Sequence, residues 1–162
     1  MILVSLGTQD KQFVRLLKTV DAAIEKGIIK DRVVVQSGQT RYESSNMEIF
    51  DFIDNDRFDA LLDECSLLIT HGGVGSIVSA NHRGKKIIAT PRLAQYGEHH
   101  NDHQKQIIAR FAQIGCLIPM WNMEDLEDCL KQAETFTPAH FESNNTQFVS
   151  LIRGYLKQWD HQ

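Results

Sequence analysis

The sequence predicts an α/β fold, a Rossmann-like parallel sheet of about six strands with helices on both faces. Short apolar runs alternate along the chain with amphipathic stretches of helical spacing. Strands and helices in this order form a parallel sheet that is covered on both faces. The chain shows no repeat, low-complexity segment or interdomain linker, and its 162 residues suit one domain. We therefore expect residues 1–162 to form a single domain.

Apolar runs and glycine stops define the elements before residue 66. Ile2–Leu6 is an apolar run that predicts a strand ending at Gly7. Residues 10–26 predict a helix, because apolar side chains recur there at helical spacing and a glycine follows. The next elements are strands at 32–36 (RVVVQ) and 48–52, with a polar turn between them, and then a brief helix around 58–62.

The same alternation continues through the middle of the chain. Residues 67–70 (LLIT) predict a strand, and residues 75–82 begin a helix. Residues 86–90 predict another strand, which Pro91 closes. A long polar loop from residue 92 to residue 101 follows this strand.

The last third of the chain begins with a well-marked helix. Asn101 is a candidate N-cap with Gln104 at the third helical position, an arrangement like a capping box. Gly115 ends this helix. The remaining predictions are a strand at 116–118, an acidic helix at 123–132 and a final helix at 141–159.

Composition excludes some classes of protein and sets an expectation for location. The formal net charge of −4 argues against non-specific binding to nucleic acid, which depends on neutralising phosphates. The three cysteines, without a CxxC motif, suit buried free thiols in a reducing compartment. The N-terminal apolar run is too short for a signal peptide, and no run approaches the roughly 20 apolar residues of a membrane span. We expect a cytoplasmic protein.

A glycine-rich turn follows the strand at 67–70. The segment His71-Gly72-Gly73-Val74-Gly75-Ser76 lies between a buried strand and a helix. Glycines let the backbone approach a phosphate closely, and the helix N-terminus offers unpaired N–H donors. The turn is neither GxGxxG nor a P-loop, so a tight turn that only solves a packing problem is an alternative. In parallel sheets ligands bind at the carboxyl ends of strands, which also directs attention to Gly7, residues 37–41 and residues 91–104.

The stretch from His71 to Gln104 resembles the C-terminal, donor-binding domain of family 28 glycosyltransferases. The opening VSLGTQDKQF, the glycine turn, the GKKIIATPR strand and the PRLAQYGEHHNDHQ loop carry the resemblance, which covers most of the chain. The likeness is greatest to small stand-alone members of this family. One branch makes the second sugar of the dolichol-linked oligosaccharide in eukaryotes, and the other is the bacterial subunit of exopolysaccharide and capsule galactosyltransferases. The implied fold is the C-terminal half of a GT-B fold.

The resemblance implies a role for each candidate substrate-binding residue. The diphosphate would lie on the backbone of the glycine turn, with Ser76 beside it and with Gly7 and Thr8 facing it. His71 would lie near the phosphates, Gln104 would contact the sugar or a phosphate beside His103, and Arg92 and residues 96–100 would shape the sugar pocket. Ser79 stands where many relatives have a glutamate that binds the ribose, which leaves the ribose contact open. The full set is Gly7, Thr8, His71, Gly72, Gly73, Gly75, Ser76, Ser79, Arg92, His103 and Gln104.

The resemblance further implies the donor-binding, catalytic subunit of a two-component glycosyltransferase. It would move a hexose, with galactose favoured, from a UDP-sugar to a lipid-linked saccharide in exopolysaccharide or capsule synthesis. No cofactor and no metal are expected. The catalytic base would lie on a membrane-anchored partner that binds the acceptor and holds this chain at the inner face of the membrane. A non-catalytic UDP-sugar-binding or enhancer subunit and a UDP-N-acetylglucosamine transferase subunit are the alternatives.

The sequence leaves more than one interpretation open for the histidine-rich loop and for the last predicted helix. His99, His100 and His103, near Glu98 and Asp102, suit a loop of the sugar pocket, solvated side chains or a metal site. The final predicted helix carries an apolar stripe that either packs on its own sheet or docks the partner. The stripe consists of Phe148, Leu151, Ile152, Tyr155, Leu156 and Trp159.

Overall fold

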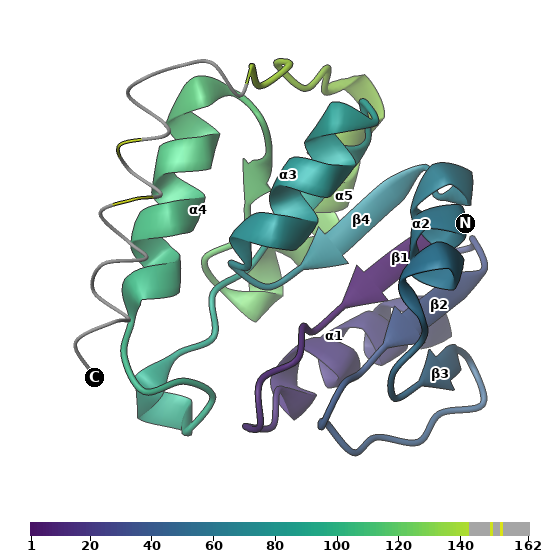
Figure 1. Cartoon of the computed structure of the whole chain (residues 1–162). Coiled ribbons are helices and arrows are strands. Elements are labelled where there is room, and N and C mark those ends of the chain that lie inside the picture. Colours follow the sequence, from purple (N-terminus) through teal and green to yellow (C-terminus); the bar gives the residue numbers. More distant parts are fainter. Residues whose placement is uncertain (143–149, 151–152, 154–162) are drawn as a thin grey trace.

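The chain forms a six-stranded, all-parallel sheet with helices on both faces in a computed structural model (Figure 1). The structure describes residues 1–142 together with Ser150 and Arg153. The strands are β1 (Ile2–Ser5), β2 (Val33–Gln36), β3 (Glu48–Phe50), β4 (Leu67–Thr70), β5 (Lys86–Ala89) and β6 (Ile118–Pro119). The helices are α1 (Val14–Glu25), α2 (Asn55–Glu64), α3 (Val74–His82), α4 (His103–Ile114) and α5 (Leu126–Thr135), with short 3-10 turns η1 (Ala94–Tyr96) and η2 (Met123–Asp125). The predicted α/β fold is confirmed.

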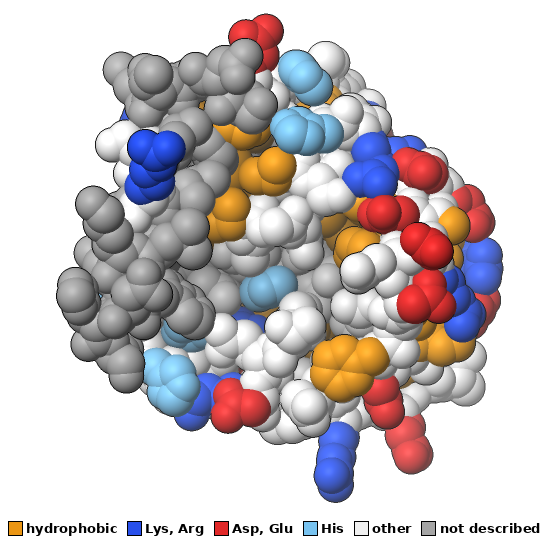
Figure 2. Space-filling view, in the orientation of Figure 1, with side chains coloured by type: hydrophobic (Ala, Val, Ile, Leu, Met, Phe, Trp, Pro, Cys, Tyr) orange, Lys and Arg blue, Asp and Glu red, His pale blue; other side chains and the backbone are white. Residues whose placement is uncertain are grey.

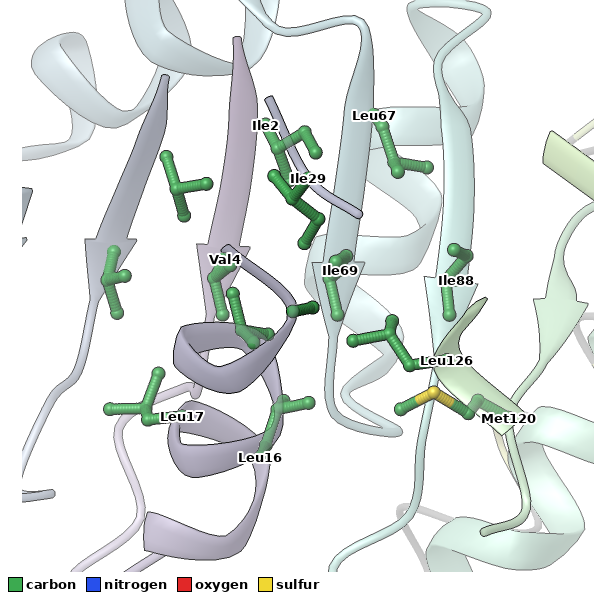
Figure 3. Close-up of a cluster of buried hydrophobic side chains, with 14 of the residues drawn as sticks. Ile2, Val4, Leu16, Leu17, Ile29, Leu67, Ile69, Ile88, Met120 and Leu126 are labelled. Carbon is green, nitrogen blue, oxygen red and sulfur yellow. The ribbon is translucent and has the colours of Figure 1, made fainter. Parts of the chain in front are cut away.

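The two faces of the sheet are covered by different helices. Helices α1 and α5 lie behind the sheet and α2, α3 and α4 lie in front of it in Figure 1. Alternate residues of each strand point to opposite faces: in β1, Ile2 and Val4 join the core under α1 and α5, whereas Leu3 joins the core under the other helices. Figure 3 shows the first of these cores, in which Leu16 and Leu126 contact the sheet from two helices.

The strand order places a topological switch point between β1 and β4. The order β3-β2-β1-β4-β5-β6 runs outward from β1 in one direction and from β4 in the other. The loop after β1 therefore turns toward α1 behind the sheet, and the loop after β4 turns toward α3 in front of it (Figure 1). Ligands of such sheets bind in the crevice that these diverging loops leave.

Some boundaries differ from those expected. Helix α1 begins at Val14 rather than at residue 10, because Phe13 is fully buried and its N–H donates to Thr40 Oγ1 at 3.0 Å. Helix α2 is longer than expected and begins after Asp54, whose carboxylate accepts the Arg57 N–H at 2.8 Å. That bond satisfies one of the N–H groups that a helix N-terminus leaves unpaired.

The C-terminal prediction is only partly within the described residues. Phe141 and Glu142 are not helical, so the predicted start of the last helix at residue 141 is wrong. Instead Asn81 of α3 holds this segment, accepting the Phe141 N–H at 2.7 Å and donating to the Ala139 carbonyl at 2.8 Å. The apolar stripe between residues 148 and 159 lies outside the described residues.

The cysteines and helix lengths bear on two further expectations. Cys65, Cys116 and Cys129 are buried free thiols, as expected, and burial raises the pKa of each. Among the described residues, no helix is long and apolar enough to cross a membrane.

Candidate functional site

The glycine turn lies at the switch point and presents backbone N–H groups. Thr70 ends β4, Gly73 is the N-cap of α3, and no side chain caps this helix. The N–H groups from Gly73 to Ser76 make no hydrogen bond to another described residue, and the first bond of the helix is from Ile77 N–H to Gly73 O at 3.3 Å. These donors and the positive end of the α3 dipole together suit an anion. Figure 2 shows that the surface is hollowed beside this end of α3, while many of the charged side chains gather over α2.

His71 forms the floor of the turn. A Cβ on Gly7 or on Gly73 would lie 2.5 Å from the His71 ring, so each glycine allows its backbone to cross the imidazole closely. Gly7 also has a φ of 73°, which favours glycine. The His71 ring thus lies between the loop after β1 and the turn after β4. The structure thus brings Gly7, His71 and Gly73, three of the predicted site residues, into close contact.

His71 is neutral at physiological pH. Its side chain is buried, and this burial, together with the positive charge of Arg92, lowers its pKa from 6.5 to about 4. The Nδ1 atom lies 3.4 Å from the Ser5 carbonyl oxygen, which favours the tautomer with the proton on Nδ1. The Nε2 atom is the ring nitrogen nearest to the two glycines.

Gln104 connects the turn to the loop after β5. Its Oε1 accepts the Gly72 N–H at 3.2 Å and the Arg92 N–H at 2.9 Å. Because Oε1 accepts from both loops, the amide is oriented and its Nε2 donors face elsewhere, with no bond to another described residue. The predicted capping box does not form, because Asp102 is the N-cap of α4 and Gln104 turns inward. The Asn101 side chain does accept the His103 N–H, at 3.0 Å.

Arg92 lies in the interior rather than on a pocket wall. Its side chain is fully buried, and its guanidinium donates to the carbonyls of Leu6 at 2.6 Å, Lys11 at 2.8 Å and Glu98 at 3.3 Å. The Phe13 ring lies 5.0 Å from the Arg92 Cζ atom. Burial lowers the pKa of Arg92 to about 10, so it remains charged at neutral pH. Arg92 therefore contacts the loops around the candidate site through their backbone.

Glu98 and His99 are also engaged within the protein. The buried Glu98 carboxylate pairs with Arg15 through two bonds of 2.9 Å and accepts the Leu93 N–H at 3.0 Å. His99 is buried, accepts the Asn101 N–H on Nδ1, and has its Nε2 3.2 Å from the Gln9 amide. Burial lowers the pKa of His99. Among the described residues, no group of three or more His, Cys, Asp or Glu side chains is placed to hold a metal ion.

The remaining candidates lie around the turn in different settings. Thr8 is exposed, Ser76 is half-exposed, and neither hydroxyl bonds to another described residue. An added Cβ on Gly75 would meet nothing within 4 Å. Ser79, one turn along α3, accepts a 2.6 Å hydrogen bond from Arg83, which also pairs with Asp63 of α2. His103 begins α4 and is half-buried.

Sequence reasoning missed the residues that hold the surrounding loops. Arg15 and Gln9 are not marked by any pattern in the sequence, although Arg15 pairs with Glu98 and Gln9 approaches His99. Gly38, after β2, lies so close to Gly7 that an added Cβ would collide with the Gly7 carbonyl. The sequence indicated Gly38 only as part of the range 37–41, which follows a predicted strand at the same edge of the sheet. Arg15 is 83 residues from Glu98 in the sequence, and no local pattern marks such a pair.

A family model matches this chain over almost its full length. The match is to the glycosyltransferase family 28 C-terminal domain and spans residues 1–154. No curated protein matches the sequence.

Solved structures of several glycosyltransferases share the fold. The glycotransferase of kitacinnamycin is 18% identical with a TM-score of 0.63, covering 83% of this chain but only 34% of its own. This chain therefore spans about a third of that protein. ALG13 is 19% identical with a TM-score of 0.60 and covers 93% of both chains. VinC, solved in complex with dTDP, is 19% identical with a TM-score of 0.55, over 83% of this chain and 34% of its own. MurG of Acinetobacter baumannii has a TM-score of 0.56 at 16% identity, over 82% of this chain and 41% of its own.

Proposed function

The chain belongs to the glycosyltransferase family 28 C-terminal domain family, and we propose that it binds the diphosphate of a nucleotide sugar over the turn that begins at His71. The observation that carries this proposal is the row of unpaired N–H groups from Gly73 to Ser76 at the switch point of the sheet. VinC, which shares the fold, was solved with a nucleoside diphosphate. A diphosphate ligand here agrees with that complex.

The chemistry of the turn suits a diphosphate. Neutral backbone donors and a helix dipole stabilise negative charge at a helix N-terminus. The Ser76 and Thr8 hydroxyls, on opposite sides of the switch point, are additional donors without other partners among the described residues. Gln104, whose amide is oriented by Gly72 and Arg92, would offer its Nε2 donors to the sugar or a phosphate.

The engaged side chains support a catalytic base on another subunit. A general base needs a free acceptor within reach of the proton it removes. The Glu98 carboxylate is buried against Arg15 and the Leu93 N–H. The ring of His71 is buried and has a pKa of about 4. In this proposal the chain supplies the donor site, and a separate acceptor-binding subunit supplies the catalytic base.

The finer proposal concerns the sugar, the acceptor and the location. We propose UDP-galactose as the donor and a lipid-linked saccharide of exopolysaccharide or capsule synthesis as the acceptor, without cofactor or metal. The acceptor-binding partner would be anchored in the membrane, with this cytoplasmic chain at its inner face. The support is the resemblance of the PRLAQYGEHHNDHQ loop to the bacterial galactosyltransferase subunits.

Calorimetry with UDP, UDP-galactose, UDP-glucose and UDP-N-acetylglucosamine tests the donor site. We expect UDP to bind and UDP-galactose to bind most tightly of the sugars. Absence of UDP binding would refute the donor proposal, whereas a preference for UDP-N-acetylglucosamine would favour the alternative transferase. Co-expression with the product of the neighbouring gene tests the subunit role. Transferase activity and membrane association should appear together, and activity of this chain alone would contradict it.

A further inference from the structure

Two loops beside the glycine turn are each held closed by a buried charged side chain, Arg92 for one loop and Glu98 for the other. The first loop, residues 6–11, follows β1, and Arg92 donates to the carbonyls of its first and last residues, Leu6 and Lys11. The second loop, residues 93–98, lies between β5 and α4, and the Glu98 carboxylate at one end accepts the Leu93 N–H at the other end. Gly7 and Thr8 lie within the first loop. Each of these two charged side chains thus fixes the separation between the ends of one loop.

Arg92 and Glu98 also join the two loops to each other. Arg92 precedes the second loop but holds the ends of the first, and it donates to the Glu98 carbonyl as well. Glu98 belongs to the second loop, and its carboxylate pairs with Arg15 of α1, the helix that follows the first loop. We call the three side chains Arg15, Arg92 and Glu98 the loop clamp. The Gln9 side chain of the first loop also lies 3.2 Å from the ring of His99, the residue that follows the second loop.

The burial of the loop clamp makes its geometry specific. Arg92 is fully buried and Glu98 is 3% exposed, so water does not compete freely for their hydrogen bonds. A guanidinium has a planar fork of donors that can serve several carbonyls at once, whereas a lysine ammonium is a point charge. Phe13 packs against the Arg92 guanidinium with its ring centroid 5.0 Å from Cζ. Arg92 is therefore held in one orientation.

From these contacts we infer that Arg92 is a positioning residue for the donor site, coupling the loop that carries Gly7 and Thr8 to the loop of residues 93–98. This inference rests on the proposed function and assigns Arg92 a role other than contact with the sugar. With both loops fixed before the donor arrives, binding does not have to order them. Loosening the loop clamp lowers donor affinity because part of the binding free energy is then used to order the loops.

The test compares Arg92→Lys with Arg32→Lys as a matched control. Arg32 pairs with Glu48 and Glu64 on the surface and has no contact with the loop clamp. Titration with UDP should show at least fivefold weaker binding for Arg92→Lys and unchanged binding for Arg32→Lys. Hydrogen exchange should be faster in residues 6–11 and 93–98 of Arg92→Lys, and unchanged in the turn at 71–76. Folded Arg92→Lys that binds UDP within twofold of the wild type overturns the inference.

A second variant decides the coupling if Arg92→Lys does not fold. Glu98→Gln keeps the side-chain size and removes the charge that pairs with Arg15. Faster exchange in both loops, 6–11 and 93–98, supports the coupling, and faster exchange in 93–98 alone overturns it. This exchange experiment needs no ligand. If the wild type does not bind UDP, the proposed function fails while the coupling of the loops is still decided.

Discussion

Replacing Gly75 with alanine tests whether this position needs glycine to leave room for a ligand or to allow packing within the protein. Gly75 lies in the first turn of α3, is exposed, and an added Cβ would meet no atom within 4 Å. Its φ is not positive, so alanine fits the backbone without strain. The bond from Cα to Cβ is tilted toward the helix N-terminus, which is where the diphosphate is proposed to lie. The new methyl group would thus lie where the diphosphate is proposed to bind, without contacting other atoms of the protein.

The expected effects on stability and on binding have opposite signs. Alanine is favoured over glycine in the interior of a helix by roughly 0.5–1 kcal/mol, and Gly75 lies in the first turn, so the free energy of unfolding should rise by at most this amount. For a chain of this size, about 1 kcal/mol corresponds to a rise of roughly 2–4 °C in Tm. UDP affinity should fall about tenfold, which is about 1.4 kcal/mol. Gly75→Leu should remove detectable binding while leaving the protein folded.

Thermal unfolding and calorimetry on the same samples measure both effects. Gln132→Ala, at an exposed position of α5, is the control for a helix substitution and should leave UDP affinity unchanged. Gly75→Ala that is more stable and binds UDP as tightly as the wild type would refute the placement of the phosphates. A Gly75→Ala protein that is strongly destabilised would refute the statement that this glycine faces open space.

Three further predictions concern the interior of the site. Gly73→Ala must displace the His71 ring, which lies 2.5 Å from the new Cβ, so we expect about 1–3 kcal/mol of destabilisation in urea unfolding and weaker UDP binding. The free energy of unfolding of the wild type should fall by up to about 3 kcal/mol as pH falls from about 6.5 to about 4. Over this range His71 binds a proton in the unfolded chain but not in the folded protein, because burial lowers its pKa to about 4. His71→Gln should lack this part of the pH dependence in unfolding experiments at each pH. Gln104→Leu leaves the buried N–H groups of Gly72 and Arg92 without their acceptor, so we expect about 1–3 kcal/mol of destabilisation by the same assay.

The sequence predicted the sheet because its strands are short apolar runs that need no long-range information. The strand of residues 67–70 has the predicted bounds, and β1, β2 and β5 are each one residue shorter than expected. The glycine turn could be placed at an edge of the sheet because strands of a parallel sheet end on the same side. Local patterns were therefore sufficient for the fold and for the position of the turn.

Tertiary contacts explain where local patterns failed. The pattern at Asn101 and Gln104 suits a capping box, but the loops after β4 and β5 bring two backbone donors to Gln104 that a local rule does not include. Phe13 has helical spacing with the residues that follow it, but Thr40, 27 residues away, holds its N–H outside the helix. The inward direction of Arg92 depends likewise on carbonyls more than 80 residues away.

The setting of the charged side chains bears on the proposed diphosphate site of this acidic protein. Two arginines beside the loops are engaged inside the protein, since Arg15 pairs with Glu98 and the charged Arg92 donates to backbone carbonyls. In the proposed complex, the N–H groups of the turn and the α3 dipole would stabilise the charge of the diphosphate. Such donors are fixed by the fold and cannot be lost by a change in pH. Because His71 lies directly beneath them, the shape of the turn and its affinity for an anion depend on the same packing of an imidazole between Gly7 and Gly73.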